Sequence, residues 1–141
     1  MWAFTRLRRM LRKWRQPASL GGRGEAAAAR FLRRRGYHIV ARGEQCFGEI
    51  DVVAVDNRTV VFVEVKTRNS DLAGSPESAV DDEKQRRLTR AALGFLKRHD
   101  LLGNSARFDV VAVTWPNGQR RPRIEHIIDA FPAVGDEQRL R

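Results

Sequence analysis

The sequence predicts an α/β fold, in which helices alternate with the strands of one mixed sheet. Two segments are rich in residues that favour helix, and several others are β-branched runs of strand length. Polar turn sequences, Asp56-Asn57-Arg58-Thr59 and Asn117-Gly118, separate strand-like runs in two places, as is typical of hairpins. The predicted order is therefore α-β-β-β-α-β-β, and 141 residues suit a single compact core.

The boundaries of the predicted elements follow from capping and turn residues. The first helix is expected over residues 21–35 and ends at Gly36, which suits the backbone of a helix C-terminus. The second helix is expected to begin at Ser75-Pro76-Glu77, where a capping serine precedes a proline, and to end near His99. The strands are expected over residues 37–41, 47–55, 60–67, 108–115 and 123–128.

The charge balance indicates a polyanionic partner. The chain has 27 Lys and Arg residues against 17 Asp and Glu residues, a formal net charge of +10. Six of the basic residues and none of the acidic ones lie within residues 1–16, so the remainder carries 21 basic against 17 acidic groups, a net charge of +4. The excess charge is therefore concentrated at the N-terminus.

Other features of the composition exclude several classes of protein. A single cysteine, Cys46, excludes an internal disulfide and a cysteine-cluster zinc site. No apolar run approaches the roughly 20 residues that a membrane-spanning helix needs, and the N-terminus lacks the apolar stretch of a secretory signal. We therefore expect a cytoplasmic protein with no membrane span.

The predicted domain organisation has three parts. Residues 1–19 form a basic tail or short amphipathic helix, residues 20–131 form the folded domain, and residues 132–141 form a polar tail. Apolar side chains recur at helical spacing in the first part, at Phe4, Leu7, Leu11 and Trp14. Such a segment suits a solvated tail, a nucleic-acid contact, an anionic membrane surface or an organellar transit peptide.

Two carboxylates are predicted to face each other in the first hairpin. A turn centred between Asn57 and Arg58 pairs residues whose numbers sum to 115, which places Asp51 opposite Glu64. Side chains alternate along a strand, so Lys66 shares their face, whereas Ile50 and Val52 are expected on the other face. Like charges in direct opposition are destabilising unless another group compensates them.

A divalent cation would provide that compensation. Mg²⁺ prefers oxygen ligands and binds one or two carboxylates together with waters and phosphate oxygens. A cation there can activate water, and Lys66 is placed to hold or deprotonate that water. The alternative is that Glu49 and Lys66 form an ordinary cross-strand ion pair while both carboxylates face solvent. Phe62 shares the face of the carboxylates, which favours a covered face.

Several motifs together resemble a known family. Gly48-Glu49-Ile50-Asp51 followed by Phe62-Val63-Glu64-Val65-Lys66-Thr67-Arg68 is similar to the D…ExK core of the PD-(D/E)xK nuclease superfamily. Together with Gly24-Glu25, Gly36-Tyr37, Lys84 and Arg107-Phe108-Asp109, this pattern resembles the YraN family, small bacterial proteins similar to Holliday junction resolvases. The resemblance covers about residues 21–113 and implies a restriction-endonuclease-like α-β-β-β-α-β core.

The resemblance also implies roles for individual residues. Asp51 and Glu64 would be metal ligands with the Val65 carbonyl as a third, and Lys66 would be the catalytic lysine. Glu25 matches an additional acid that resolvase-like proteins bring from the first helix, although a helix-terminal acid favoured by the helix dipole is the other explanation. The expected nucleic-acid contacts are Arg68, Lys84, Gln85 and Arg86, and Arg87 and Arg90 on the same helix are further candidates for phosphate contacts.

The sequence therefore favours a bacterial nuclease dependent on Mg²⁺ or Mn²⁺ that binds structured or branched DNA and hydrolyses phosphodiester bonds. The alternative is a nucleic-acid-binding module with a weak or inactive site that acts with a partner protein. A third hypothesis is a basic adaptor that docks on a membrane or ribosome through residues 1–16. Substrates with two-fold symmetry would favour a homodimer.

Overall fold

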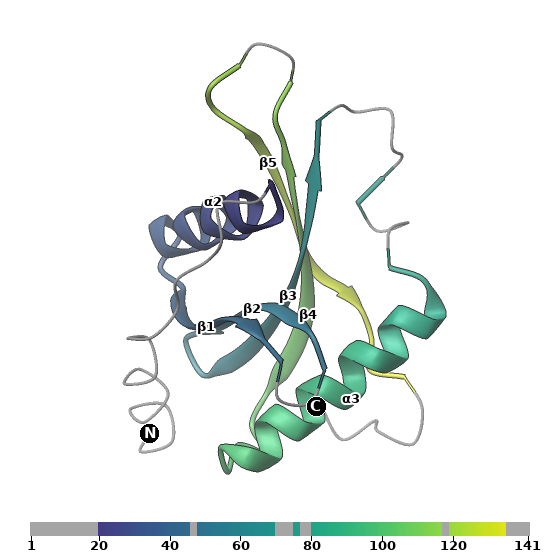
Figure 1. Ribbon diagram of the computed structural model, residues 1–141. Coiled ribbons are helices and arrows are strands. Elements are labelled where there is room, and N and C mark those ends of the chain that lie inside the picture. Colours follow the sequence, from purple (N-terminus) through teal and green to yellow (C-terminus); the bar gives the residue numbers. More distant parts are fainter. Residues whose placement is uncertain (1–19, 46–47, 70–74, 77–79, 117–118, 135–141) are drawn as a thin grey trace.

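A computed structural model describes residues 20–45, 48–69, 75–76, 80–116 and 119–134 of the chain (Figure 1). The elements occur in the predicted order α-β-β-β-α-β-β. They are α2 (Leu20–Arg34), β1 (His38–Glu44), β2 (Ile50–Asp56), β3 (Thr59–Arg68), α3 (Asp82–Arg98), β4 (Ala106–Thr114) and β5 (Arg123–Phe131). The basic segment 1–19 and most of the predicted C-terminal tail lie outside the described residues.

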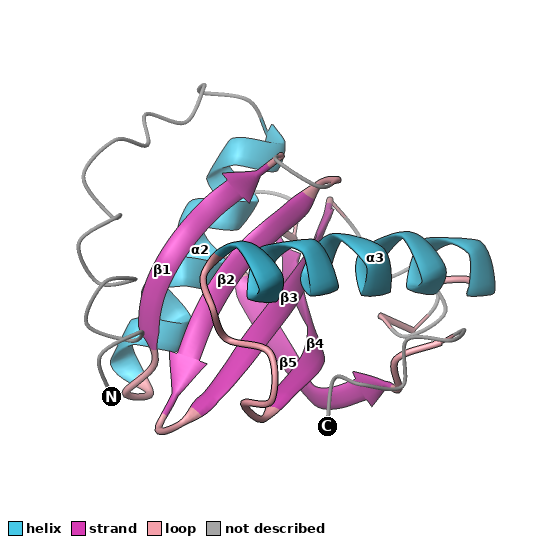
Figure 2. Cartoon of the chain, turned by 90° about the horizontal axis from the view of Figure 1, so that it is seen from below, coloured by secondary structure: helices cyan, strands magenta, loops and turns pink. Residues whose placement is uncertain are grey.

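The five strands form one mixed sheet in the order β1-β2-β3-β4-β5. Neighbouring strands are antiparallel except β3 and β4, which run parallel and are joined by the crossover helix α3. Helix α2 covers one face of the sheet and α3 covers the other, as Figures 1 and 2 show. The predicted α/β fold is confirmed, and its arrangement is that of a restriction-endonuclease-like core.

Each face of the sheet has its own apolar cluster. On the α3 side, Phe62 contacts Phe95 and Phe108 at ring-centroid distances of 5.8 Å each. On the α2 side, Leu32 packs with Val52 and other strand residues. Complete burial of a side chain of this size contributes about 1.5–3 kcal/mol. The face that carries Phe62 is therefore covered by a helix, as the sequence indicated.

The sequence prediction differs from the structure chiefly at the start of α3 and in the position of Ile50, and β1 and β5 end three residues later than predicted. Helix α3 begins at Asp82 and not near Pro76, because the Asp81 side chain caps it by accepting a hydrogen bond of 2.8 Å from the Lys84 N–H. Ile50 packs with the α3-side cluster rather than beside Val52. It is the first residue of β2, and pairing with β3 begins only at Val52, so strict alternation does not yet apply there.

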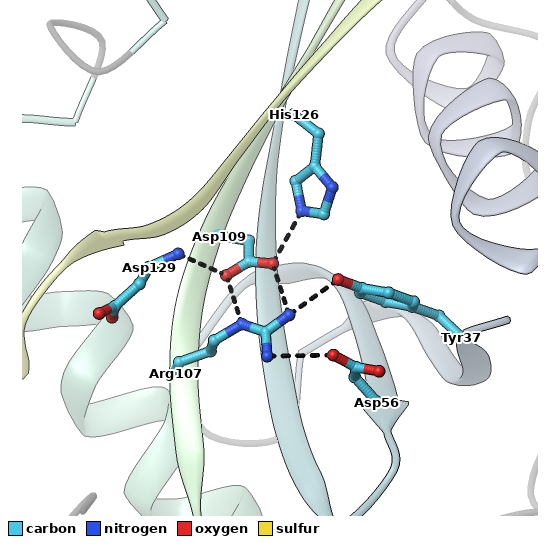
Figure 3. Close-up of polar contacts among 6 residues, drawn as sticks. All are labelled: Tyr37, Asp56, Arg107, Asp109, His126 and Asp129. Carbon is cyan, nitrogen blue, oxygen red and sulfur yellow. Dashed lines mark hydrogen bonds and ion pairs between the residues drawn. The ribbon is translucent and has the colours of Figure 1, made fainter. Parts of the chain in front are cut away.

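A polar network on the α2 side of the sheet ties β2, β4 and β5 to Tyr37, the residue just before β1 (Figure 3). The Asp109 side chain has no exposed surface and accepts hydrogen bonds from Arg107 at 3.0 and 3.3 Å. His126 Nε2 lies 2.8 Å from the same carboxylate, and the Asp129 N–H donates to it at 2.9 Å. Arg107 also reaches Tyr37 Oη at 2.8 Å and Asp56 at 3.3 Å. Each oxygen of the Asp109 carboxylate has two hydrogen-bond partners, so this network contributes to the stability of the fold.

Within the described ranges, no helix has the length and apolar character required to cross a lipid bilayer.

Candidate active site

The structure brings Asp51 and Glu64 together on the α3 side of the sheet. The pairs Val52–Val63 and Val53–Phe62 have the predicted register, and the next position along each strand holds one carboxylate. Asp51 shares a hydrogen bond with Glu64, whose side chain is nearly buried. Two acids therefore meet in a covered position, as the turn length and strand alternation predicted.

The backbone of β3 fixes the Asp51 carboxylate. The Val65 N–H donates a hydrogen bond of 2.8 Å to Asp51 Oδ2. The pairing of β2 with β3 begins at Val52, so beyond it the Asp51 side chain accepts the hydrogen bond of the Val65 N–H in place of a backbone carbonyl. The carboxylate is held in place by the backbone rather than by a flexible cation.

The electrostatics of this pair are unfavourable to two negative charges. Burial, the adjacent Glu64 and the more distant Glu25 raise the pKa of Asp51 to about 8, while the Val65 N–H acts in the opposite direction. At neutral pH the pair therefore retains a proton when no cation is bound. The raised pKa means that the surroundings favour the neutral form of Asp51, and a bound metal cation would favour its charged form instead.

The donor set fits a hard divalent cation. Two carboxylates and the neighbouring Val65 carbonyl are the oxygen donors that Mg²⁺ binds, with waters completing its shell. Across the described parts of the chain, no three His, Cys, Asp or Glu side chains form a metal-binding cluster. The fit therefore rests on Asp51 and Glu64, and a complete ligand set would need backbone oxygens, water and substrate.

Helix α3 supplies a cation to the same pair. The Lys84 ammonium forms an ion pair with Glu64 Oε1. Its position follows from the α3 start, because the Asp81 cap fixes the first turn that carries Lys84. The structure therefore places the Lys84 ammonium on one of the two carboxylates, and the predicted contact of Lys84 with nucleic acid stays a prediction.

A cavity of about 450 Å³ lies between the sheet and α3 at this point. Its lining residues are Gly48, Glu49, Asp51, Glu64, Lys84, Arg87, Leu88 and Arg90. The acids belong to the strands or the segment that precedes β2, and all three cations belong to α3. The cavity therefore has an acidic floor and a basic wall, which is an arrangement that suits a phosphate near a cation.

Two glycines permit these close approaches. Gly48 has φ +123°, and a side chain there would come within 3.1 Å of the Ala91 Cβ of α3. A Cβ at Gly24, near the start of α2, would overlap the Thr67 hydroxyl of β3. That contact brings Glu25 near enough to influence the pKa of Asp51 from the other helical layer. These glycines thus allow both helices to approach the hairpin.

Lys66 follows Glu64 by two residues on β3 and is half-buried. Strand alternation places the Lys66 side chain on the same face of the sheet as Glu64, but Lys66 is not among the residues that line the cavity. Glu49 is exposed and precedes β2, so the predicted cross-strand pair of Glu49 with Lys66 has no place in the strand register. The role of Lys66 stays a prediction.

The remaining predicted contacts are dispersed. Arg68 is buried at the end of β3, with 8% of its surface exposed. The Gln85 side chain donates to the Val80 carbonyl at 3.1 Å and so supports the helix start. Arg86 is exposed on α3 but does not line the cavity, whereas Arg87 and Arg90 do. The spacing from Lys84 to Arg87 was the available signal, since residues three apart share a helix face.

Comparison with known proteins identifies the relatives of this chain. Residues 24–113 match the sequence profile of the uncharacterised protein family UPF0102. The UPF0102 protein of Rhodopirellula baltica is 53% identical over 122 residues, which cover 84% of this chain and 73% of the relative. The UPF0102 proteins of Geotalea uraniireducens and Geobacter metallireducens are 48% and 49% identical over 114 residues, covering 80% of this chain and 89% and 92% of those relatives. The chain therefore belongs to the UPF0102 family, which is the YraN family that its motifs resemble.

Proposed function

We propose that this protein is a Mg²⁺-dependent nuclease-like phosphodiester hydrolase that acts on structured or branched DNA. The observation that carries the proposal is the pair formed by half-buried Asp51 and buried Glu64 beneath the basic wall of α3. The pair has the oxygen chemistry of a divalent metal site, and the wall has the charge of a phosphate-binding surface. The choice of DNA and of a branched substrate comes from the resemblance of the motifs.

Asp51 and Glu64 would hold the metal, with the Val65 carbonyl as a further donor. Bound Mg²⁺ or Mn²⁺ would supply Lewis-acid activation of the attacking water and of the phosphate. The chain itself keeps Asp51 oriented through the Val65 N–H and places the Lys84 ammonium against Glu64. Lys66 is proposed to assist proton movement from the same strand face, and Glu25 to add negative charge from α2.

Arg87 and Arg90 are proposed to hold the phosphate backbone. Both line the cavity, and guanidinium groups bind phosphate oxygens in a bidentate manner. Arg86 is the matched control, because it is adjacent on the same helix and exposed but does not line the cavity. Arg87→Ala is expected to weaken DNA binding about three- to tenfold and to reduce the salt dependence by about one counterion. Equal losses for Arg86→Ala and Arg87→Ala would contradict this placement.

The decisive experiment is cleavage of single-stranded, flap and four-way-junction DNA in Mg²⁺ or Mn²⁺. Asp51→Asn and Glu64→Gln are expected to lower the cleavage rate at least about 100-fold, because each removes a charged metal ligand. The cleavage rates of Lys66→Met and Lys84→Met show which of the two lysines contributes to the reaction. A wild-type protein that cuts none of these substrates, or ligand variants that cut as fast as wild type, would overturn the proposal.

A second candidate function is a nucleic-acid-binding module with a weak or inactive site, acting with a partner protein. Two observations favour it. Lys66 does not line the cavity, and the cations of α3 that do line it suit binding as well as catalysis. In that case DNA affinity would depend on Arg87 and Arg90 while no metal-dependent cleavage occurs. Cytoplasmic location, a homodimer and a role for residues 1–16 stay predictions.

A further inference from the structure

A second basic groove lies on the α2 side of the sheet, opposite the carboxylate pair. Figure 1 shows α2 lying beside the β4–β5 hairpin, and the groove of about 400 Å³ is formed where these two elements meet. Four arginines line it, with two from α2 and two from the segment just before β5: Arg30, Arg34, Arg120 and Arg121. The other lining residues are Ala27, Phe31, Pro122 and Ile124. The groove therefore combines arginines from two elements with an apolar floor, and it has no acidic lining residue.

The charge of these four arginines is not compensated within the part of the chain that the structure describes. All four are exposed, and none forms an ion pair with a described acid. Two neighbouring arginines are instead placed over aromatic rings, Arg35 over Phe31 at 4.3 Å and Arg23 over Trp115 at 4.9 Å. Converging cations repel one another, so a ligand that neutralises them is favoured.

We propose that this α2 groove binds the phosphate backbone of nucleic acid, at a site separate from the carboxylate pair. All of its cations are arginines, whose planar guanidinium groups suit the bidentate recognition of phosphate. Because arginines approach from both α2 and the segment before β5, phosphates lying along the groove can be contacted from two sides. The apolar floor formed by Phe31 and Ile124 suits the sugars and bases that accompany the phosphates.

An anionic membrane surface is the competing ligand, and the surface chemistry argues against it. Interfacial binding requires apolar side chains that insert beside the basic residues. Among the described residues, the large hydrophobic side chains that are exposed are Leu102 and Ile128, and neither lines the groove. Phe31 and Ile124 are half-buried in its floor. The groove therefore matches a narrow polyanion better than a lipid surface.

Binding of nucleic acid in the groove is expected to need no metal, because the groove lies on the other face of the sheet from Asp51 and Glu64. Its test is the affinity of the full chain for a fluorescently labelled 30-base-pair DNA duplex, measured by anisotropy in EDTA as the NaCl concentration is varied. The variant Arg30→Glu/Arg34→Glu is compared with Arg33→Glu/Arg58→Glu, in which both positions are exposed and neither lines the groove. Each pair of substitutions changes the net charge by −4, from +10 to +6.

We expect the affinity of the groove variant for DNA to fall at least about tenfold at 0.1 M salt. The slope of log binding constant against log salt concentration is expected to decrease in magnitude by about 2. The charge-matched control is expected to lose less than about threefold. Arg120→Glu/Arg121→Glu, which lies outside helices and strands, repeats the test without altering α2. Circular dichroism establishes that each variant is folded.

Two results would overturn the inference. One is an equal loss of affinity in the groove variants and the charge-matched control, which would leave only the net charge as a cause. The other is that the groove variants bind phosphatidylglycerol vesicles more weakly than wild type does, while they bind DNA as tightly as wild type. Because the measurement is made in EDTA, an absence of metal-dependent cleavage would contradict the proposed nuclease function and leave this result unaffected.

Discussion

Two carboxylates on different strands of the sheet, the buried Asp109 and the half-buried Asp51, have opposite electrostatic environments. Asp109 on β4 lies among Arg107, His126 and the Asp129 N–H, and these hydrogen bonds hold its pKa below the usual range although burial alone would raise it. Asp51 on β2 has one backbone N–H and faces Glu64, and its pKa is raised to about 8. The fold thus supplies hydrogen-bond donors that keep Asp109 ionised, whereas Asp51 is given a single donor and an acidic neighbour, which is the arrangement expected of the proposed ligand site.

The largest expected effect is the loss of the compensated acid. Asp109→Asn is expected to lower the free energy of unfolding by about 3–5 kcal/mol, because it removes the buried charge that Arg107 contacts. Urea denaturation measures this change. Asp56→Asn is the control, since Asp56 contacts the same guanidinium from a more exposed position, and it is expected to cost less than about 1 kcal/mol. Equal costs would remove the distinction between the two environments.

The corresponding substitution at Asp51 is expected to raise the free energy of unfolding rather than lower it. Asp51→Asn retains an oxygen for the Val65 N–H but removes an acid whose ionisation is opposed by burial and by Glu64. We expect it to stabilise the metal-free protein by about 1–3 kcal/mol at pH 7.5 while it abolishes cleavage. Urea denaturation in EDTA is the measurement, and a destabilised Asp51→Asn variant would show that Asp51 contributes to the fold rather than to a ligand site.

The two acids should also respond oppositely to pH. Between its ordinary pKa of 3.8 and about 8, Asp51 is ionised in the unfolded chain but protonated in the folded one, so its contribution to stability falls as pH rises through this range. Asp109 has a lowered pKa, so its contribution is present above 3.8 and is lost as the pH falls below that value. The stability advantage of Asp51→Asn over wild type should therefore be greater at pH 8 than at pH 5, and an advantage independent of pH would be inconsistent with the raised pKa.

The smallest of these effects is stabilisation by metal. Mg²⁺ at ten times its dissociation constant is expected to stabilise wild type by about 1.4 kcal/mol, because the proposed site at Asp51 and Glu64 would bind it in the folded state alone. Thermal unfolding in MgCl₂, compared with NaCl of equal ionic strength, measures the shift. Asp51→Asn should show no shift specific to Mg²⁺, and a shift of the same size in that variant would place metal binding elsewhere.

The sequence predicted the carboxylate pair because the hairpin is local. A two-residue turn and the alternation of side chains determine which residues of β2 and β3 face each other, and Asp51 and Glu64 follow from that register. The predicted start of α3 was wrong because the chain has two capping signals, Ser75-Pro76 and Asp81. The buried Val80 just before Asp81 favours a start at the second signal.

The basic residues around the site were harder to predict. Which residues of α3 face the carboxylates depends on how the helix packs through Leu88, Ala91 and Phe95, and that orientation is a tertiary property. Arg87 and Arg90 were therefore not distinguished from Arg86. The α2 groove combines residues about 90 positions apart in the sequence, and no local pattern indicates that they meet.

The parallel pairing of β3 with β4 has a kinetic consequence. The β2–β3 hairpin closes across Asn57 and Arg58, whereas Val60 pairs with Ala106 only after the whole of α3 has crossed the sheet. Local contacts form before distant ones, so the Asp51–Glu64 repulsion arises before α3 can deliver the Lys84 ammonium. We expect the carboxylate pair to slow folding, and Asp51→Asn to increase the refolding rate in stopped-flow measurements more than it decreases the unfolding rate.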